Sequence, residues 1–482
     1  MSDNLRDKTV QGVAWSFVER FSVQGVTFLL ELIIARIIGP ESYGLIAMLA
    51  IFMAVSQVFI DGGFSNALIQ RKNRDESDFS TVFYINLGIS LLVYALLFVF
   101  APAISKFFQQ PLLCDITRVY SINLVINSLV AVNKTKLTIA VDFKTQSKIS
   151  FFSALLSGLV GLSMALAGWG VWALVWQAIA AAVFNALLSY YYVRWIPSKS
   201  FSIESFHRLF NFGSKLLVAT LISSLYARIY DVVIGKKFSS SSLGLYSRAD
   251  KFNQFASSNI SGILSRVSFP ILSQIQDDDA RLLSVYKQYV QMSALVMFPL
   301  ILGMGGVAAP LIQALLGDEW MGCVPMLQVL TLAYIWDCVI MVNLNLIYVK
   351  GHSDYVLRLE IIKKTIAFGI LLITMNFGLL AICWGRVIYS LIAFYLNTYY
   401  TKRLLNYGFL TQLREISPFI LMSLLIAAEG YFLGVTISSP WVALLSAMVA
   451  CTITYIAMCK VFNIATFNLL FNIIKDKING YH

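Results

Sequence analysis

Charged and polar side chains recur at helical spacing inside an apolar run near the start of the chain. Within residues 12–38 the stripe consists of Ser16, Arg20, Gln24, Thr27 and Glu31, at steps of four, four, three and four. Residues three and four apart share one face of a helix. A charge at the centre of a bilayer costs at least about 2.5 kcal/mol, so such residues persist where they face a partner or a water-filled cavity.

The same spacing recurs in two later runs. Residues 211–235 carry Thr220, Ser224, Arg228 and Asp231, and the most polar run, 245–272, carries Ser247, Asp250, Gln254, Ser258, Ser261 and Ser265 with Lys251 and Arg266 beside them. Arginine and lysine suit an anionic ligand such as pyrophosphate. We therefore predict a hydrated cavity whose binding residues are Arg20, Gln24, Glu31, Asp61, Arg228, Asp231, Arg248, Lys251 and Arg266.

An alternative interpretation is a dry core in which these groups satisfy one another. Arg20 would then pair with Glu31 or Asp61, and Arg228 with Asp231. Two further acids, Asp337 and Glu429, stand alone in apolar runs, and we expect each to be paired locally.

The composition indicates an all-α polytopic membrane protein. Of 482 residues, 58% are hydrophobic and 13% are charged, and mean hydropathy is +0.75, whereas soluble chains carry about 25% charged residues. Apolar runs of about 20 residues predict about fourteen spans, with approximate limits 12–38, 43–69, 80–104, 112–133, 149–168, 170–195, 211–235, 245–272, 288–316, 324–349, 355–377, 379–401, 415–436 and 440–463. We expect the first span to be retained and not cleaved as a signal peptide.

No catalytic or metal site is predicted. The three histidines are far apart, the six cysteines contain no CxxC pair, and there is no P-loop motif, so the chain is not expected to be an ATPase.

Most Lys and Arg residues lie in alternate connections, which by the positive-inside rule places both termini in the cytoplasm. This bias accounts for most of the net charge of +11 without nucleic acid as a partner. The exception is a basic cluster around the predicted outer turn KKFSSSSLGLYSRADK, which contains Lys236, Lys237, Arg248 and Lys251. This placement indicates a functional role.

Two pairs of segments indicate an internal repeat with an offset of about 200 residues. IIGPESYGLIAML from Ile37 resembles KKFSSSSLGLYSRA from Lys236, aligning Gly44 with Gly244, and ALIQRKNRDESDFSTVFY from Ala67 resembles ILSQIQDDDARLLSVYKQY from Ile271. We predict two pseudo-symmetric six-helix lobes, 1–199 and 200–407, followed at 408–482 by two additional transmembrane helices and a cytoplasmic tail.

Several stretches resemble a known family. ARIIGPESYG from Ala35, LRDKTVQGVAWS, DGGFSNALIQRK, FPILSQIQDD and LGDEWMGCVPMLQVL resemble the polysaccharide-transporter branch of the multidrug/oligosaccharidyl-lipid/polysaccharide (MOP) superfamily. The resemblance is closer to Wzx flippases of the colanic-acid exporter type. It implies a MATE-like arrangement of two lobes around a cavity with two extra C-terminal helices.

The resemblance also implies a function, the flipping of undecaprenyl-diphosphate-linked oligosaccharides across the bacterial inner membrane. Partners would be the lipid-linked oligosaccharide, membrane lipids and the polymerase or export machinery. No cofactor is expected, and coupling to H+ or Na+ is left open, with Asp61, Glu31 or Asp231 as candidate carboxylates. Three alternatives are a drug or cation antiporter of the same superfamily, a membrane polymerase or ligase enzyme, and a non-transporting scaffold.

Overall fold

The computed structural model describes residues 2–468, with side chains from residue 23 onward except at 212 and 263. It is built from helices, and no strand occurs within 2–468. The chain divides into two compact units, Met1–Gly244 and Leu245–His482. The predicted lobe boundaries stay a prediction.

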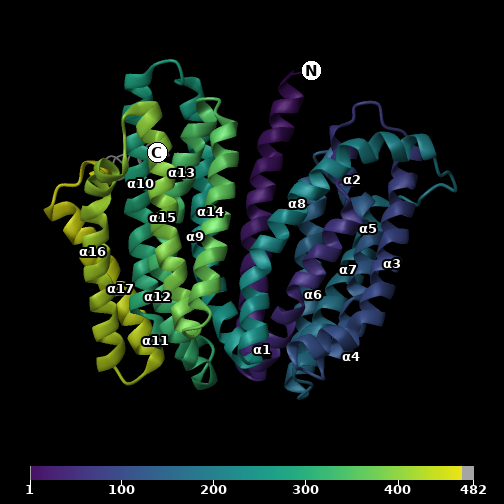
Figure 1. Cartoon of the computed structure of the whole chain (residues 1–482), viewed down its shortest axis with the longest axis horizontal. Coiled ribbons are helices and arrows are strands. Elements are labelled where there is room, and N and C mark those ends of the chain that lie inside the picture. Colours follow the sequence, from purple (N-terminus) through teal and green to yellow (C-terminus); the bar gives the residue numbers. More distant parts are fainter. Residues whose placement is uncertain (1, 469–482) are drawn as a thin grey trace, which may run out of the picture. The chain divides into compact units, whose positions relative to one another are not determined.

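The first unit contains eight helices and the first turn of a ninth. In Figure 1 these run from purple to teal: α1 (Ser2–Asp61), α2 (Phe64–Gln70), α3 (Glu76–Phe108), α4 (Leu113–Tyr120), α5 (Ile122–Ile139), α6 (Phe143–Leu166), α7 (Val171–Val193), α8 (Ile203–Lys237) and α9 (Ser240–Gln274). Within this unit α1 packs against α6 and α8, and α5 lies between α3 and α7.

The second unit contains the rest of α9 and the helices drawn from teal to yellow in Figure 1: α10 (Asp279–Gly306), α11 (Ala308–Leu315), the 3₁₀ turn η1 (Asp318–Cys323), α12 (Val324–Tyr334), α13 (Asp337–Val349), α14 (Ser353–Thr374), α15 (Leu379–Leu405), α16 (Phe409–Thr436) and α17 (Pro440–Val461). The two final helices are integrated into the unit, because α16 packs along α10 and α17 packs against α16 and α11.

Ten helical segments of the described chain are long and apolar enough to cross a membrane. Every predicted span overlaps a helix, but three do not meet this criterion: 112–133, which is broken at Ser121 between α4 and α5, and the spans in α9 and α14. The last two are rich in polar and charged residues. The number of fourteen spans therefore stays a prediction.

The sequence ARIIGPESYG forms a sharp reversal within α1. Gly39 has φ 71° and ψ 174°, outside the helical region, and Pro40 follows it. The hydroxyl of Tyr43 donates to the carbonyl of Glu31 at 3.1 Å, whereas twelve residues of straight helix would separate these positions by about 18 Å. The chain therefore folds back here, which gives the two predicted spans 12–38 and 43–69.

Two glycines permit a close crossing between α1 and the first turn of α9, all within the first unit. A Cβ atom at Gly44 would overlap the Ser240 carbonyl, and one at Gly244 would overlap the Pro40 carbonyl. A shift of 200 positions converts one contact into the other, because Gly44 corresponds to Gly244 and Pro40 to Ser240, as in an isologous contact between equivalent parts. This reciprocity supports the predicted repeat and explains why both segments carry glycine.

Each unit also has a helix that begins with an N-capping aspartate followed by an acidic residue paired with a lysine. In the first, Asp75 accepts the Asp78 amide at 2.8 Å before α3, and Lys136 pairs with Glu76 at 2.7 Å. In the second, Asp278 accepts the Arg281 amide at 3.0 Å before α10, and Lys350 pairs with Asp279 at 2.5 Å. N-capping aspartates satisfy free amides at the first turn of a helix.

Candidate functional site

Arg228, one of the two predicted basic residues of the first unit, lies on a partly exposed surface of α8. Arg228 Nη1 is 3.4 Å from Asp231 Oδ2, and their side chains are 48% and 14% exposed. The alternative interpretation correctly anticipated this pair. However, an arginine that is about half exposed is not in a dry core, and its guanidinium keeps donors for a ligand.

The other predicted residues of this unit lie on α1. Gln24 is exposed, and Glu31 and Asp61 are half-buried. Asp61 Oδ1 accepts the hydroxyl of Ser65 at 2.5 Å. Arg20 lies outside the residues whose side chains are described, so its predicted role and its proposed pairing with Glu31 or Asp61 stay predictions.

Helix α9 of the second unit is polar on two faces. The first face is exposed and carries Lys251, Gln254, Ser258 and Arg266. These positions follow the helical repeat and extend along about 22 Å of the helix. Two of the predicted binding residues, Lys251 and Arg266, thus share a solvent-accessible face.

The second polar face of α9 turns into its own unit. Ser257 Oγ donates to Asp337 Oδ2 at 2.8 Å, and Asn345 of α13 contacts the hydroxyls of Ser265 and Ser268 at 3.1 and 3.0 Å. Of the polar stripe predicted from the sequence, Ser265 contacts α13, whereas Ser257 and Ser268 lie outside that stripe. The expected local pairing of Asp337 is confirmed, as is that of Glu429, which accepts from Thr454 at 3.1 Å.

An arginine outside the predicted site completes this inner face. Arg386 of α15 forms an ion pair with Asp250 of α9 and donates to the hydroxyls of Tyr246 and Tyr334, each at 2.9 Å. Tyr334 also donates to Asp250 at 2.8 Å. The sequence signal was a single arginine in the apolar run LLAICWGRVIYSLIAF, which does not reveal its partners.

Arg248 differs from the other predicted cavity residues. It is only 3% exposed, and its guanidinium carbon lies 5.3 Å from the centre of the Trp320 ring, which is a cation–π arrangement. In this conformation it is not accessible to a ligand.

Within the described part of the chain, no group of three or more His, Cys, Asp or Glu side chains is placed to hold a metal ion. The exposed polar atoms on α8 and α9 can instead form hydrogen bonds and ion pairs with an anionic or hydroxylated ligand.

Comparison with known proteins identifies the family. Residues 33–325 match the family described as polysaccharide biosynthesis protein, Polysacc_synt_3. The teichuronic acid biosynthesis protein TuaB of Bacillus subtilis is 26% identical over 417 residues, covering 84% of this chain and 85% of TuaB. The lipopolysaccharide biosynthesis protein WzxC of Escherichia coli K12 is 23% identical over 366 residues, covering 75% and 74% of the two chains.

Solved structures show the same fold. The lipid II flippase MurJ, in an inward closed conformation, aligns with a TM-score of 0.72 at 15% identity, covering 94% of this chain and 98% of that one. An inward-facing multidrug resistance MATE transporter aligns with a TM-score of 0.60 at 16% identity, covering 85% and 98%. Since the family match spans more than half of the sequence, this chain belongs to the polysaccharide biosynthesis protein family Polysacc_synt_3.

Proposed function

We propose that this protein translocates undecaprenyl-diphosphate-linked oligosaccharide repeat units across the bacterial inner membrane, for exopolysaccharide, O-antigen or capsule synthesis. Both termini are placed in the cytoplasm in this proposal. The names of TuaB, WzxC and the succinoglycan biosynthesis transport protein ExoT of Rhizobium meliloti, 25% identical over 338 residues, connect relatives to polysaccharide synthesis.

The observation that carries the proposal is the exposed polar face of α9. Many exposed residues of the other long helices are apolar, such as Val99 of α3 at 71% and Leu187 of α7 at 62%, and these suit contact with lipid tails. The exposed Gln254, Ser258 and Arg266 of α9 do not. Polar groups that meet hydrocarbon without a partner cost several kcal/mol each, so in this proposal the face meets water or a polar cargo.

In this proposal the basic residues hold the diphosphate while the lipid tail stays in the bilayer. Within the first unit Arg228 supplies donors for phosphate oxygens, and Arg20 is retained as a predicted contributor. Within the second unit Lys251 and Arg266 supply such donors. Exposed Gln and Ser side chains form hydrogen bonds with sugar hydroxyls. The sugars then cross beside protein polar groups and avoid the cost of entering hydrocarbon.

Alternating access is the proposed cycle, as expected for transporters built from repeats. Release of the headgroup on the outer side would be driven by loss of one set of basic contacts. Coupling to a proton or sodium gradient is proposed to involve Asp61, Glu31 or Asp231, since each is a carboxylate on the α1 and α8 faces described above.

The test replaces basic residues in a strain that lacks its own flippase. Arg228→Gln and Arg266→Gln should each reduce surface polymer at least tenfold and cause lipid-linked repeat units to accumulate inside. Arg414→Gln, an exposed charge at the start of α16, is the matched control and should export normally. Full export by the Arg228→Gln/Arg266→Gln double variant would remove these residues from the mechanism and favour a cation antiporter, because such a protein does not need cavity bases.

A further inference from the structure

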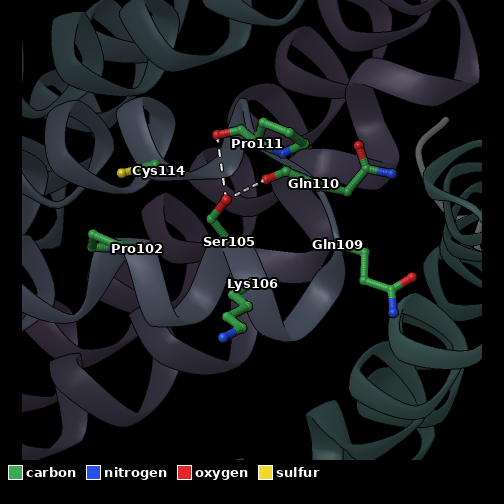
Figure 2. Close-up of a pocket in the computed structure, with 7 residues that line it drawn as sticks. All are labelled: Pro102, Ser105, Lys106, Gln109, Gln110, Pro111 and Cys114. Carbon is green, nitrogen blue, oxygen red and sulfur yellow. Dashed lines mark hydrogen bonds between the residues drawn. The ribbon is translucent and has the colours of Figure 1, made fainter.

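A cavity of about 420 Å³ lies in the first unit where α3 ends and α4 begins, and nothing above gives it a function. Figure 2 shows the residues that line it: Pro102, Ser105, Lys106, Gln109, Gln110, Pro111 and Cys114. Its volume falls within the range typical of small-molecule sites, roughly 300–1,000 Å³. In the predicted topology this turn lies on the outer side of the membrane.

The wall of the cavity is held in place by its own hydrogen bonds. Ser105 Oγ donates to the Gln110 carbonyl at 2.8 Å, and the Gln110 amide donates to the Ser105 carbonyl at 3.1 Å (Figure 2 shows the first of these). Gln109 adopts the left-handed conformation, with φ 57°, and closes the helix. A binding wall that is ordered before a ligand arrives loses less entropy on binding.

The negative potential that a helix C-terminus normally has is reduced at the end of α3, which favours an anion there. The C-terminus of a helix ordinarily repels anions, but here Lys236 donates to the Phe107 carbonyl and lies 4.6 Å from the centre of the Phe107 ring. The Gln109 amide covers the Lys106 carbonyl. None of the seven lining residues is acidic.

Three polar side chains in this wall remain available. In the part of the chain that the structure describes, the Lys106 ammonium and the side-chain amides of Gln109 and Gln110 form no intramolecular hydrogen bond or ion pair, and Lys106 and Gln109 are exposed. An ammonium binds a carboxylate or phosphate, amides bind vicinal hydroxyls, and the rings of Pro102 and Pro111 offer apolar surface to sugar C–H groups.

We propose that this cavity is a docking site for an acidic sugar residue of the cargo on the outer face of the membrane. The inference rests on the proposed function, because it assumes that the cargo carries sugars. The carboxylate of a uronic acid would pair with Lys106, and its ring hydroxyls would bond with Gln109 and Gln110. An anionic lipid headgroup presents the same charge without the sugar ring, so the experiment separates the two.

Cys114 provides the readout, since it is half-buried in the cavity wall whereas the other five cysteines are buried. The rate of Cys114 alkylation by N-ethylmaleimide is measured on the purified full chain in nanodiscs, with D-glucuronate, D-glucose or glycerol phosphate added at millimolar concentration. Glucuronate should slow alkylation at least threefold, whereas glucose and glycerol phosphate should not. Lys106→Gln should abolish the protection, and Lys237→Gln, a neighbouring basic residue outside the cavity, should keep it. Cys114→Ser gives the background.

Equal protection by glycerol phosphate would replace the sugar with a lipid headgroup, and no protection by glucuronate would overturn the site. Labelling of intact cells with a membrane-impermeant maleimide should modify Cys114, and its absence would overturn the outer placement. These assays involve no transport step. If the export test fails but glucuronate still protects Cys114, the flippase proposal would be wrong and the sugar site would stand.

Discussion

Two arginines that sit in apolar helices, one in each unit, have opposite surroundings. Arg228 of α8 is 48% exposed and has one 3.4 Å ion pair with an acid on its own helix. Arg386 of α15 is 21% exposed and is bound by three side chains from two other helices, namely Asp250 and Tyr246 of α9 and Tyr334 of α12. The guanidinium of Arg228 can still bind a ligand, whereas that of Arg386 is already bonded to protein side chains.

The difference indicates that a charge in a membrane helix has two distinct uses. Arg386 crosslinks the inner faces of α9, α12 and α15, because a charge in a low-dielectric interior persists only with full hydrogen bonding. Arg228 gains little from Asp231 and is therefore retained for another purpose, which we propose to be cargo binding. Residues with these two roles should differ in their contribution to the free energy of unfolding.

Arg386→Ala should have the largest effect. Removing the guanidinium leaves Asp250 without its cation. The two side chains are 21% and 28% exposed, so the loss should be smaller than the about 3–5 kcal/mol that breaking a fully buried pair costs. Thermal unfolding in detergent should show a clear loss of stability. The double variant Asp250→Asn/Arg386→Gln should recover part of it, because no unpaired charge remains. A single variant as stable as the parent would show that the network does not hold the unit together.

Tyr334→Phe should cause the second largest loss of stability. It removes the hydroxyl that accepts from Arg386 at 2.9 Å and donates to Asp250 at 2.8 Å, and hydrogen bonds to charged groups contribute about 1.5–3 kcal/mol. The same unfolding measurement applies, with Tyr348→Phe as control because its side chain is exposed. If both changes have equal effects, the hydroxyl does not serve the network.

Arg228→Ala should leave stability almost unchanged. Exposed ion pairs contribute about 0.2–1 kcal/mol, so the unfolding temperature should stay near that of the parent while polymer export is lost. This combination separates a binding residue from a structural one. A loss of stability as large as that of Arg386→Ala would mean that the two arginines have the same role.

Asp231→Asn should have the smallest effect on stability, at most about 0.5 kcal/mol, since the partner arginine is exposed. Its export rate is informative in a second way. If Asp231 only orients Arg228, export should fall modestly at every external pH. A changed pH dependence of export would instead support a role in proton coupling.

Sequence spacing predicted the polar stripes, but it could not show which polar residues of a helix pack against other helices and which are exposed. On α9 the sequence did not distinguish Asp250 and Ser265 of the predicted stripe from Lys251 beside it. In the structure Ser265 contacts α13 and Asp250 contacts α15, whereas Lys251 is exposed. Arg386 was missed because its partners lie 52 to 140 positions away in sequence, beyond any helical periodicity.

The sequence by itself determined that this is a helical membrane protein, because mean hydropathy and the length of apolar runs follow from composition alone. It also determined the reversal at Gly39–Pro40 and the family, since both depend on local residue identity. Only the tertiary structure decided that Arg248 lies buried against Trp320 and Arg386 in an ion pair, while Arg228 stays accessible. The physical reason is that helical spacing fixes which residues share a face, whereas the packing of distant helices fixes whether that face meets protein or water.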